Sequence, residues 1–225
     1  MNIDVPTLYI VLVLLNLLQI LALYVQYKIN KTYDGVGWWL LWSVFSFFGF
    51  GFTLLRDIPG VFEVVATIQN TAIVLGTIFI YTGVSRFLNA KESPSVISTI
   101  LLLFFSGFFY FLFVENSSDR RGIVINITLT SFAVITAVTI FTNRISSISN
   151  MMRFIAVSLL FHAGVLLYRS YLMLWLPSNV DMFEPVFYNI LPVFDTIILT
   201  LILTFGFIMA INQRLQHDIT TTKDH

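Results

Sequence analysis

Seven apolar stretches separated by short polar segments fill nearly all of the 225 residues. A hydrocarbon core about 30 Å thick needs about 20 apolar residues per helical crossing, and a helix satisfies its own backbone polar groups there. Only 11% of the residues are charged, against about a quarter in soluble domains. The sequence therefore predicts an all-α polytopic membrane protein, a bundle of seven transmembrane helices. The predicted spans are 6–27, 36–55, 64–86, 95–114, 122–143, 152–175 and 187–211.

The Lys and Arg residues predict the orientation, because cytoplasmic segments are enriched in these cations. Eight of the twelve lie on the side of the C-terminus, three lie on the opposite side and Arg169 lies within a span. We expect the N-terminus outside, the C-terminus in the cytoplasm and a multi-pass location in a prokaryotic plasma or inner membrane. Aromatic residues near the predicted boundaries, such as Trp38, Trp39 and Trp42, are typical of interfacial anchors.

The chain has no composition shift that would mark a domain boundary. We expect one transmembrane domain over residues 1–211, followed at 212–225 by a short cytoplasmic tail or the start of a signalling helix. The first span follows Asp4 rather than a basic leader, which argues against a cleaved signal peptide. Ile208, Ile211 and Leu215 continue a helical spacing beyond the last span.

The side chains of enzymatic sites are scarce. The chain has no cysteine, and its three histidines do not form a metal-binding spacing. No lysine lies in span 187–211, which excludes a retinal Schiff base there. We expect no enzymatic activity, no cofactor, no metal and no nucleic-acid partner.

Charges embedded in the spans are the strongest candidates for a functional site, since they are costly in hydrocarbon unless paired or hydrated. Arg169 lies about 9 Å and Asp195 about 12 Å below the outer ends of their spans, at 1.5 Å per residue. We therefore predict that they approach each other. One interpretation is an interhelical ion pair that locks the bundle, and the other is the polar floor of an outward-facing cavity.

Other polar residues cluster near the same predicted end. His162 is two turns before Arg169, where it could sense protons, receive a ligand or be a hydrogen-bonded core residue. Pro192 removes a backbone donor one turn before Asp195 and should bend the last helix. Further candidates for ligand recognition are Tyr168, Tyr171, Tyr188, Asn70, Glu63 and Arg56. The tyrosines are equally typical of interface anchors.

Several amides lie inside the spans, including Asn16, Gln19, Gln69 and Asn126. Hydrogen bonds between helices and close packing account for most such residues in membranes.

Two stretches carry a resemblance to a known family. Residues 33–57 contain Tyr-Asp-Gly-Val-Gly-Trp-Trp, Phe-Gly-Phe-Gly and Leu-Leu-Arg-Asp, and residues 70–88 contain Asn-Thr, Leu-Gly and Tyr-Thr-Gly-Val-Ser-Arg-Phe-Leu. Together with 110–114, Arg121, Arg153 and Arg169, they resemble the membrane-embedded N-terminal sensor regions of bacterial and archaeal diguanylate cyclases and sensor histidine kinases.

This resemblance implies a seven-helix sensor of an extracellular or membrane-dissolved small molecule or lipid, as in two-component systems. Its last helix would pass the signal to a cytoplasmic kinase or cyclase output, and a homodimer would suit a dimeric output. The sequence given ends without such a module, so the resemblance implies either a sensor fragment or a stand-alone member that signals through a partner. A small transporter or flippase and a structural membrane subunit without ligand are the alternatives.

Overall fold

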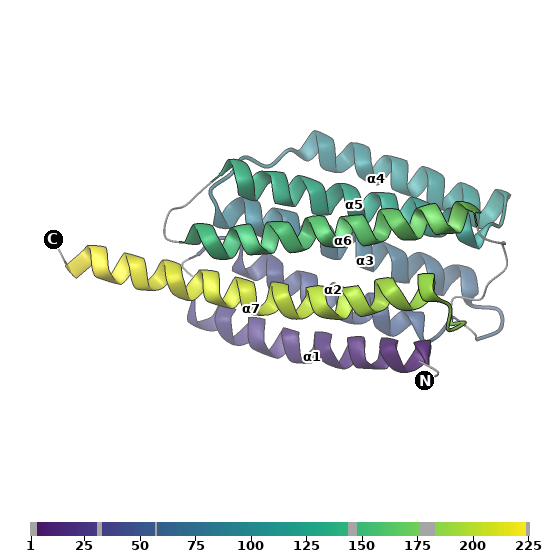
Figure 1. Ribbon diagram of the computed structural model, residues 1–225, viewed down its shortest axis with the longest axis horizontal. Helices are drawn as coiled ribbons and strands as arrows, with labels where there is room; N and C mark the ends of the chain where they lie inside the picture. Colours follow the sequence, from purple (N-terminus) through teal and green to yellow (C-terminus); the bar gives the residue numbers. More distant parts are fainter. Residues whose placement is uncertain (1–3, 31–32, 57, 144–147, 176–182, 224–225) are drawn as a thin grey trace.

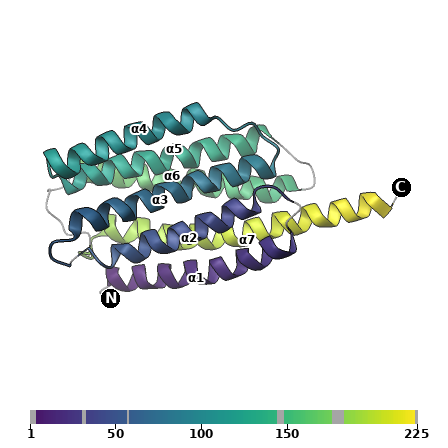
Figure 2. The same ribbon diagram turned by 180° about the vertical axis from the view of Figure 1, so that it is seen from behind.

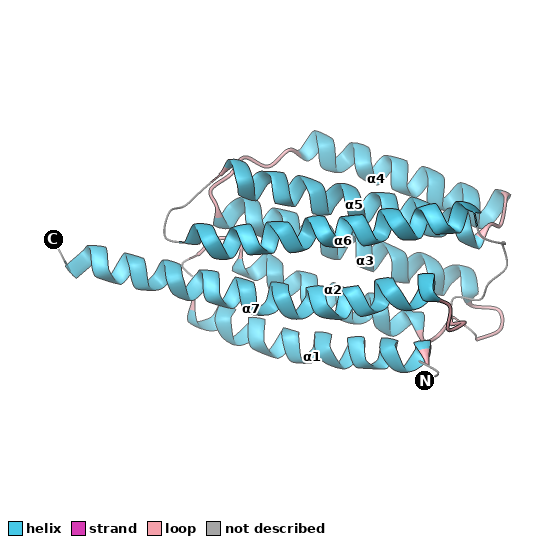
Figure 3. Ribbon diagram, viewed as in Figure 1, coloured by secondary structure: helices cyan, strands magenta, loops and turns pink. Residues whose placement is uncertain are grey.

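The computed structural model describes residues 4–30, 33–56, 58–143, 148–175 and 183–223. Two of the cations counted above to predict orientation, Lys31 and Arg144, lie outside this part. Figure 3 shows helices joined by loops throughout the described part of the chain. The elements are α1 (Val5–Ile29), α2 (Val36–Thr53), α3 (Phe62–Phe87), α4 (Pro94–Phe109) with the π-helical turn η1 (Tyr110–Val114), α5 (Ser118–Thr142), α6 (Ser149–Trp175) and α7 (Phe187–Lys223).

In the described part of the chain, seven of these helical segments are long and apolar enough to cross a membrane, which confirms the predicted all-α architecture and the positions of the predicted helices. Local signals fix several helix starts. The Asp4 carboxylate accepts a hydrogen bond from Thr7 N at 3.1 Å, and Ser117 Oγ accepts one from Arg120 N at 3.4 Å. Each satisfies a backbone donor that a first helical turn leaves without a partner.

Six of the helices form a closed ring in the order α1, α2, α3, α5, α6 and α7, with α7 returning to pack on α1. α4 lies outside this ring and packs mainly against α5 (Figures 1 and 2). Phe104, Phe108 and Leu112 fill that contact together with Val74 of α3 and Phe132 of α5. The sequence alone did not distinguish α4, although it is the least buried of the spans.

Glycines allow α2 and α3 to approach closely. A Cβ at Gly49 would lie 2.7 Å from Ile73 Cγ1, and one at Gly83 would lie 2.5 Å from ring atoms of Trp39. Gly35, before α2, has φ +105° and its Cβ position is 2.3 Å from Gly83 O, so both its conformation and its neighbour exclude a larger side chain. Small residues at contacts of this kind are typical of membrane helices.

Two of the predicted interfacial anchors are instead part of the interior. Trp39 is fully buried and stacks on Phe207 of α7, with ring centroids 3.9 Å apart and planes 4° apart. Trp42 is also buried and meets the same phenylalanine edge-on. Both lie on the side of α2 that faces the inside of the ring, where Phe207 of α7 meets them.

α7 is the longest helix, with 37 residues. It begins at the end of the bundle where α1 begins, which we call the N-end, and runs to the opposite C-end. Figure 1 shows its last turns projecting beyond the other helices.

Candidate functional site

A cavity of about 180 Å³ lies inside the ring, and all six ring helices contribute side chains to it. An engineered cavity of about 150 Å³ is enough to bind benzene, so this space suits a small organic molecule. The apolar part of its wall includes Leu12, Trp42, Phe50, Ile73, Leu129, Leu166, Leu199 and Leu203. The polar part includes Tyr9, Ser46, Arg56, Gln69, Asn70, Thr77, Asp119, Arg121, Asn126, His162, Arg169, Tyr188, Asn189 and Thr196.

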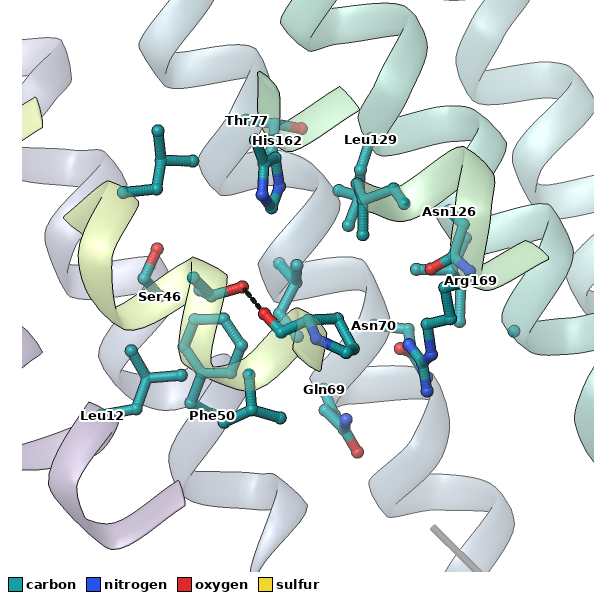
Figure 4. Close-up of a pocket in the computed structure, with 18 of the residues that line it drawn as sticks. Leu12, Ser46, Phe50, Gln69, Asn70, Thr77, Asn126, Leu129, His162 and Arg169 are labelled. Carbon is teal, nitrogen blue, oxygen red and sulfur yellow. Dashed lines mark hydrogen bonds between the residues drawn. The ribbon is translucent and has the colours of Figure 1, made fainter. Parts of the chain in front are cut away.

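The polar side chains occupy two levels along the bundle. Arg169 and Gln69 belong to the level nearer the N-end, and His162 and Thr77 belong to the deeper level (Figure 4). Seven residues separate His162 from Arg169 along α6, which corresponds to about 10 Å. A bound molecule would therefore meet a cation at one level and the His162 ring at the other.

Arg169 extends from α6 toward the side of the cavity that carries Asn70 (Figure 4). Its Nε atom is buried and has no hydrogen-bond partner among the described residues. Tyr9, Tyr188 and Asp119 line the same cavity. A buried donor without a partner is costly, so this guanidinium is poised to receive an acceptor.

The other two arginines of the wall are already engaged. Arg121 donates through Nη1 to Phe111 O at 2.9 Å and to Asn116 Oδ1 at 3.2 Å. Its guanidinium carbon lies 5.4 Å from the ring centre of Phe62, and that of Arg56 lies 5.2 Å from the same ring. These contacts place three cations around the N-end of the cavity.

The predicted approach of Arg169 to Asp195 is wrong. Asp195 is buried and its Oδ2 lies 2.5 Å from Nδ1 of His162. The prediction assumed that α6 and α7 end level, but Figure 1 shows α6 reaching further toward the N-end than the start of α7. His162 is about 20 Å from the end of α6 and Asp195 about 12 Å from the start of α7, so an offset of about 8 Å brings them level.

Pro192 lies within α7 as predicted and lines the cavity. Proline lacks an N–H group, so the backbone bond to residue 188 cannot form. Thr196 donates its hydroxyl to Pro192 O at 2.6 Å. The irregular turn of α7 thus lies directly beside the His162–Asp195 pair.

The structure brings only part of the predicted site residues together. Arg169, His162, Tyr188, Asn70 and Arg56 line the cavity, and Asp195 lies behind His162. Three other candidates do not line it: Tyr168 and Tyr171 are 47% and 57% exposed on the outside of α6, and Glu63 is exposed at the start of α3. The helical period explains why the two tyrosines do not line the cavity, since positions one before and two after Arg169 point away from the helix face that carries Arg169.

Other lining residues were not candidates in the sequence. Gln69 is 3% exposed and its Oε1 has no hydrogen-bond partner in the described part of the chain. Asn126 donates through Nδ2 to Ser170 Oγ at 3.1 Å, which ties α5 to α6. Both had been noted only as packing amides. Gln69 and Asn126 can be recognised as cavity residues only when the ring order is known, because that order determines which side of α3 and of α5 faces the inside of the ring.

A second polar cluster lies where α7 leaves the bundle. Arg214 donates to Phe87 O at 2.5 Å and lies over the rings of Tyr33 and Phe87. The Tyr33 hydroxyl donates to Asp218 Oδ2 at 2.7 Å. Burial and then this hydrogen bond raise the pKa of Tyr33 to about 12. These contacts connect the exit of α7 to the end of α3 and to the connection before α2, and we call them the exit cluster.

Within the described ranges, no group of three or more His, Asp or Glu side chains is placed to hold a metal ion. The cavity combines an apolar wall with a few convergent polar groups, which is the usual arrangement of a small-molecule site. The chain matches no protein-family model, and comparisons with curated proteins and with solved structures find no significant similarity.

Proposed function

We propose that this protein is a membrane sensor that binds a small molecule in the six-helix cavity and passes the signal through α6 and α7. The observation that carries the proposal is that α7 both lines the cavity and continues as one helix beyond the bundle. Displacement at Pro192 or at the His162–Asp195 pair is therefore connected to the projecting end without an intervening loop.

A signal requires two arrangements of the bundle that bind the ligand unequally, since a ligand with equal affinity for both shifts nothing. The polar contacts between α6 and α7 and the irregular turn at Pro192 are the elements proposed to differ between the two arrangements. The exit cluster gives the movement a second point of control, because α7 there contacts the ends of α3 and the connection before α2.

The distribution of Lys and Arg supports an orientation with the N-end outside and the C-end in the cytoplasm. In that orientation the Arg169 level of the cavity lies toward the outer face, and the cavity receives an extracellular or membrane-dissolved molecule. The projecting end of α7 would act on a cytoplasmic kinase or cyclase, as the resemblance of the sequence implies. We propose no enzymatic activity for the chain itself.

The test is a distance measurement between spin labels. The chain has no cysteine, so Lys91→Cys and Gln216→Cys can be labelled selectively in lipid nanodiscs. Both positions are exposed, one in the connection after α3 and the other on the projecting part of α7. Benzoate, benzyl alcohol and benzylamine serve as probes of equal size and different charge.

We expect at least one probe to change the distance distribution, and Leu129→Phe, which narrows the cavity, to abolish that change. A probe that binds without moving α7 would contradict the sensor proposal. Probe flux across liposomes would then favour a transporter. A structural subunit predicts neither binding nor movement.

A further inference from the structure

We infer that the ligand of the cavity is a small organic carboxylate, held through Arg169, with an apolar body about the size of benzene. This inference rests on the proposed function and narrows it to one class of molecule. The argument begins with the charges of the wall.

Among the described residues that line the cavity, three are cationic and only Asp119 is an acid. Arg121 is engaged with Phe111 O and Asn116. Asp195 pairs with His162 and is not part of the wall. The wall therefore carries more positive than negative charge, which suits an anion, and Arg169 offers a buried Nε without a hydrogen-bond partner in the described part of the chain.

The geometry of Arg169 favours a carboxylate. Its buried Nε lacks a hydrogen-bond partner in the described part of the chain, and Nε with an adjacent Nη forms a planar fork. Such a fork matches the two oxygens of a carboxylate. A neutral alcohol would leave the charge uncompensated, and an ammonium would be repelled by it.

The remaining wall defines the body of the molecule. Leu166 lies one turn from Arg169 on α6, and Leu129 and Phe50 face the same space from α5 and α2 (Figure 4). The volume of about 180 Å³ exceeds the benzene-binding cavity only slightly. A compact aromatic or branched aliphatic body fits, and it would lie between Arg169 and the His162 level.

The experiment uses the full chain in nanodiscs of zwitterionic phosphatidylcholine, so that no anionic lipid competes. Binding of 4-fluorobenzoate, 4-fluorobenzyl alcohol and 4-fluorobenzylamine is followed by ¹⁹F NMR line broadening against empty nanodiscs. The variants are Arg169→Gln, Leu129→Phe and, as the matched control, Arg120→Gln. Arg120 is at the same end of the bundle, pairs with Glu115 and does not line the cavity.

We expect the benzoate to bind the native chain and Arg120→Gln with equal affinity. It should bind Arg169→Gln at least about tenfold more weakly, because a factor of this size corresponds to the loss of one charge-assisted hydrogen bond. Leu129→Phe, which keeps the charge, should weaken it as well. Circular dichroism verifies that each variant is folded. Oleate, whose chain is much larger than the cavity of about 180 Å³, should not displace the benzoate, and displacement by oleate would overturn the compact apolar body.

Equal or stronger binding of the alcohol or the amine, or unchanged benzoate binding in Arg169→Gln, overturns the carboxylate inference. If the probe that binds in either of these cases no longer binds to Leu129→Phe, the cavity is still supported as the ligand site and only the carboxylate class is withdrawn. If no probe binds the native chain and no probe moves the spin labels, both the inference and the proposed sensor function are contradicted.

Discussion

His162 and Asp195 form a buried contact between α6 and α7. Removing one member of such a pair leaves the other without compensation, whereas replacing both by apolar residues often costs little. We expect His162→Phe to lower the free energy of unfolding by about 2 kcal/mol and the double variant with Asp195→Leu to recover most of it. Unfolding in mixed micelles, followed by circular dichroism, measures both.

Ser158→Ala is the control for this pair, because Ser158 is on the exposed side of α6 and, among the described residues, its hydroxyl donates to the backbone of its own helix at Phe154. Its effect should stay within about 0.5 kcal/mol. If the losses in free energy of unfolding caused by His162→Phe and by Asp195→Leu simply add in the double variant, the two side chains are not coupled.

Tyr33 gives a prediction for alkaline pH. Its pKa is raised in the folded protein to about 12, above the ordinary value of about 10. The folded state therefore holds the phenol proton between these values while the unfolded state releases it, so this contribution to stability is complete below pH 10 and is lost as the pH rises toward 12.

Absorbance of tyrosinate at alkaline pH, taken as the difference between the native chain and Tyr33→Phe, should give a midpoint near the raised value. Asp218→Asn should move this midpoint down, but only part of the way, because burial is the larger cause of the shift. A midpoint that does not respond to Asp218→Asn would mean that the hydrogen bond in the exit cluster does not form in solution.

The packing of α2 on α3 depends on a few glycines. A Cβ at Gly83 would lie 2.5 Å from Trp39, whereas one at Gly51 would have no neighbour within 4 Å. We expect Gly83→Ala to cost about 1 to 3 kcal/mol through overpacking and Gly51→Ala to be neutral or slightly stabilising, since alanine is the better helix former. Unfolding of the two variants in mixed micelles compares them directly, and equal stabilities would contradict the close contact.

The helices themselves could be predicted from the sequence, because hydrophobic length is a local property and each span satisfies its own backbone. The predicted span 36–55 corresponds to α2 at Val36–Thr53, and the span 95–114 corresponds to α4 with η1. The vertical offset of α6 and α7 could not be predicted in this way. It is a relation between two helices and not a property of either span, and it decides that Asp195 meets His162 rather than Arg169.

The candidate site was predictable only in part for a related reason. An embedded Arg169 is conspicuous in any single span, and the polar content of α6 is a local signal. Gln69, Asn126 and Trp42 acquire a role only through the ring order, in which α3 contacts α5 and α4 is displaced to the outside. Sequential helices that pack side by side would have placed α4 between α3 and α5.

The orientation of the whole bundle can be tested by the accessibility of single cysteines in intact cells. Ile58 lies in the connection between α2 and α3 at the N-end and is 49% exposed, and Lys91 lies in the exposed connection between α3 and α4 at the C-end. Because cytoplasmic segments are enriched in Lys and Arg, we expect a membrane-impermeant maleimide to label Ile58→Cys in intact cells and Lys91→Cys only after permeabilisation. The reverse pattern would put the cavity in the cytoplasmic half and the projecting end of α7 outside. It would thereby remove the physical basis for a cytoplasmic output, because the helix that lines the cavity would then lead away from the cytoplasm.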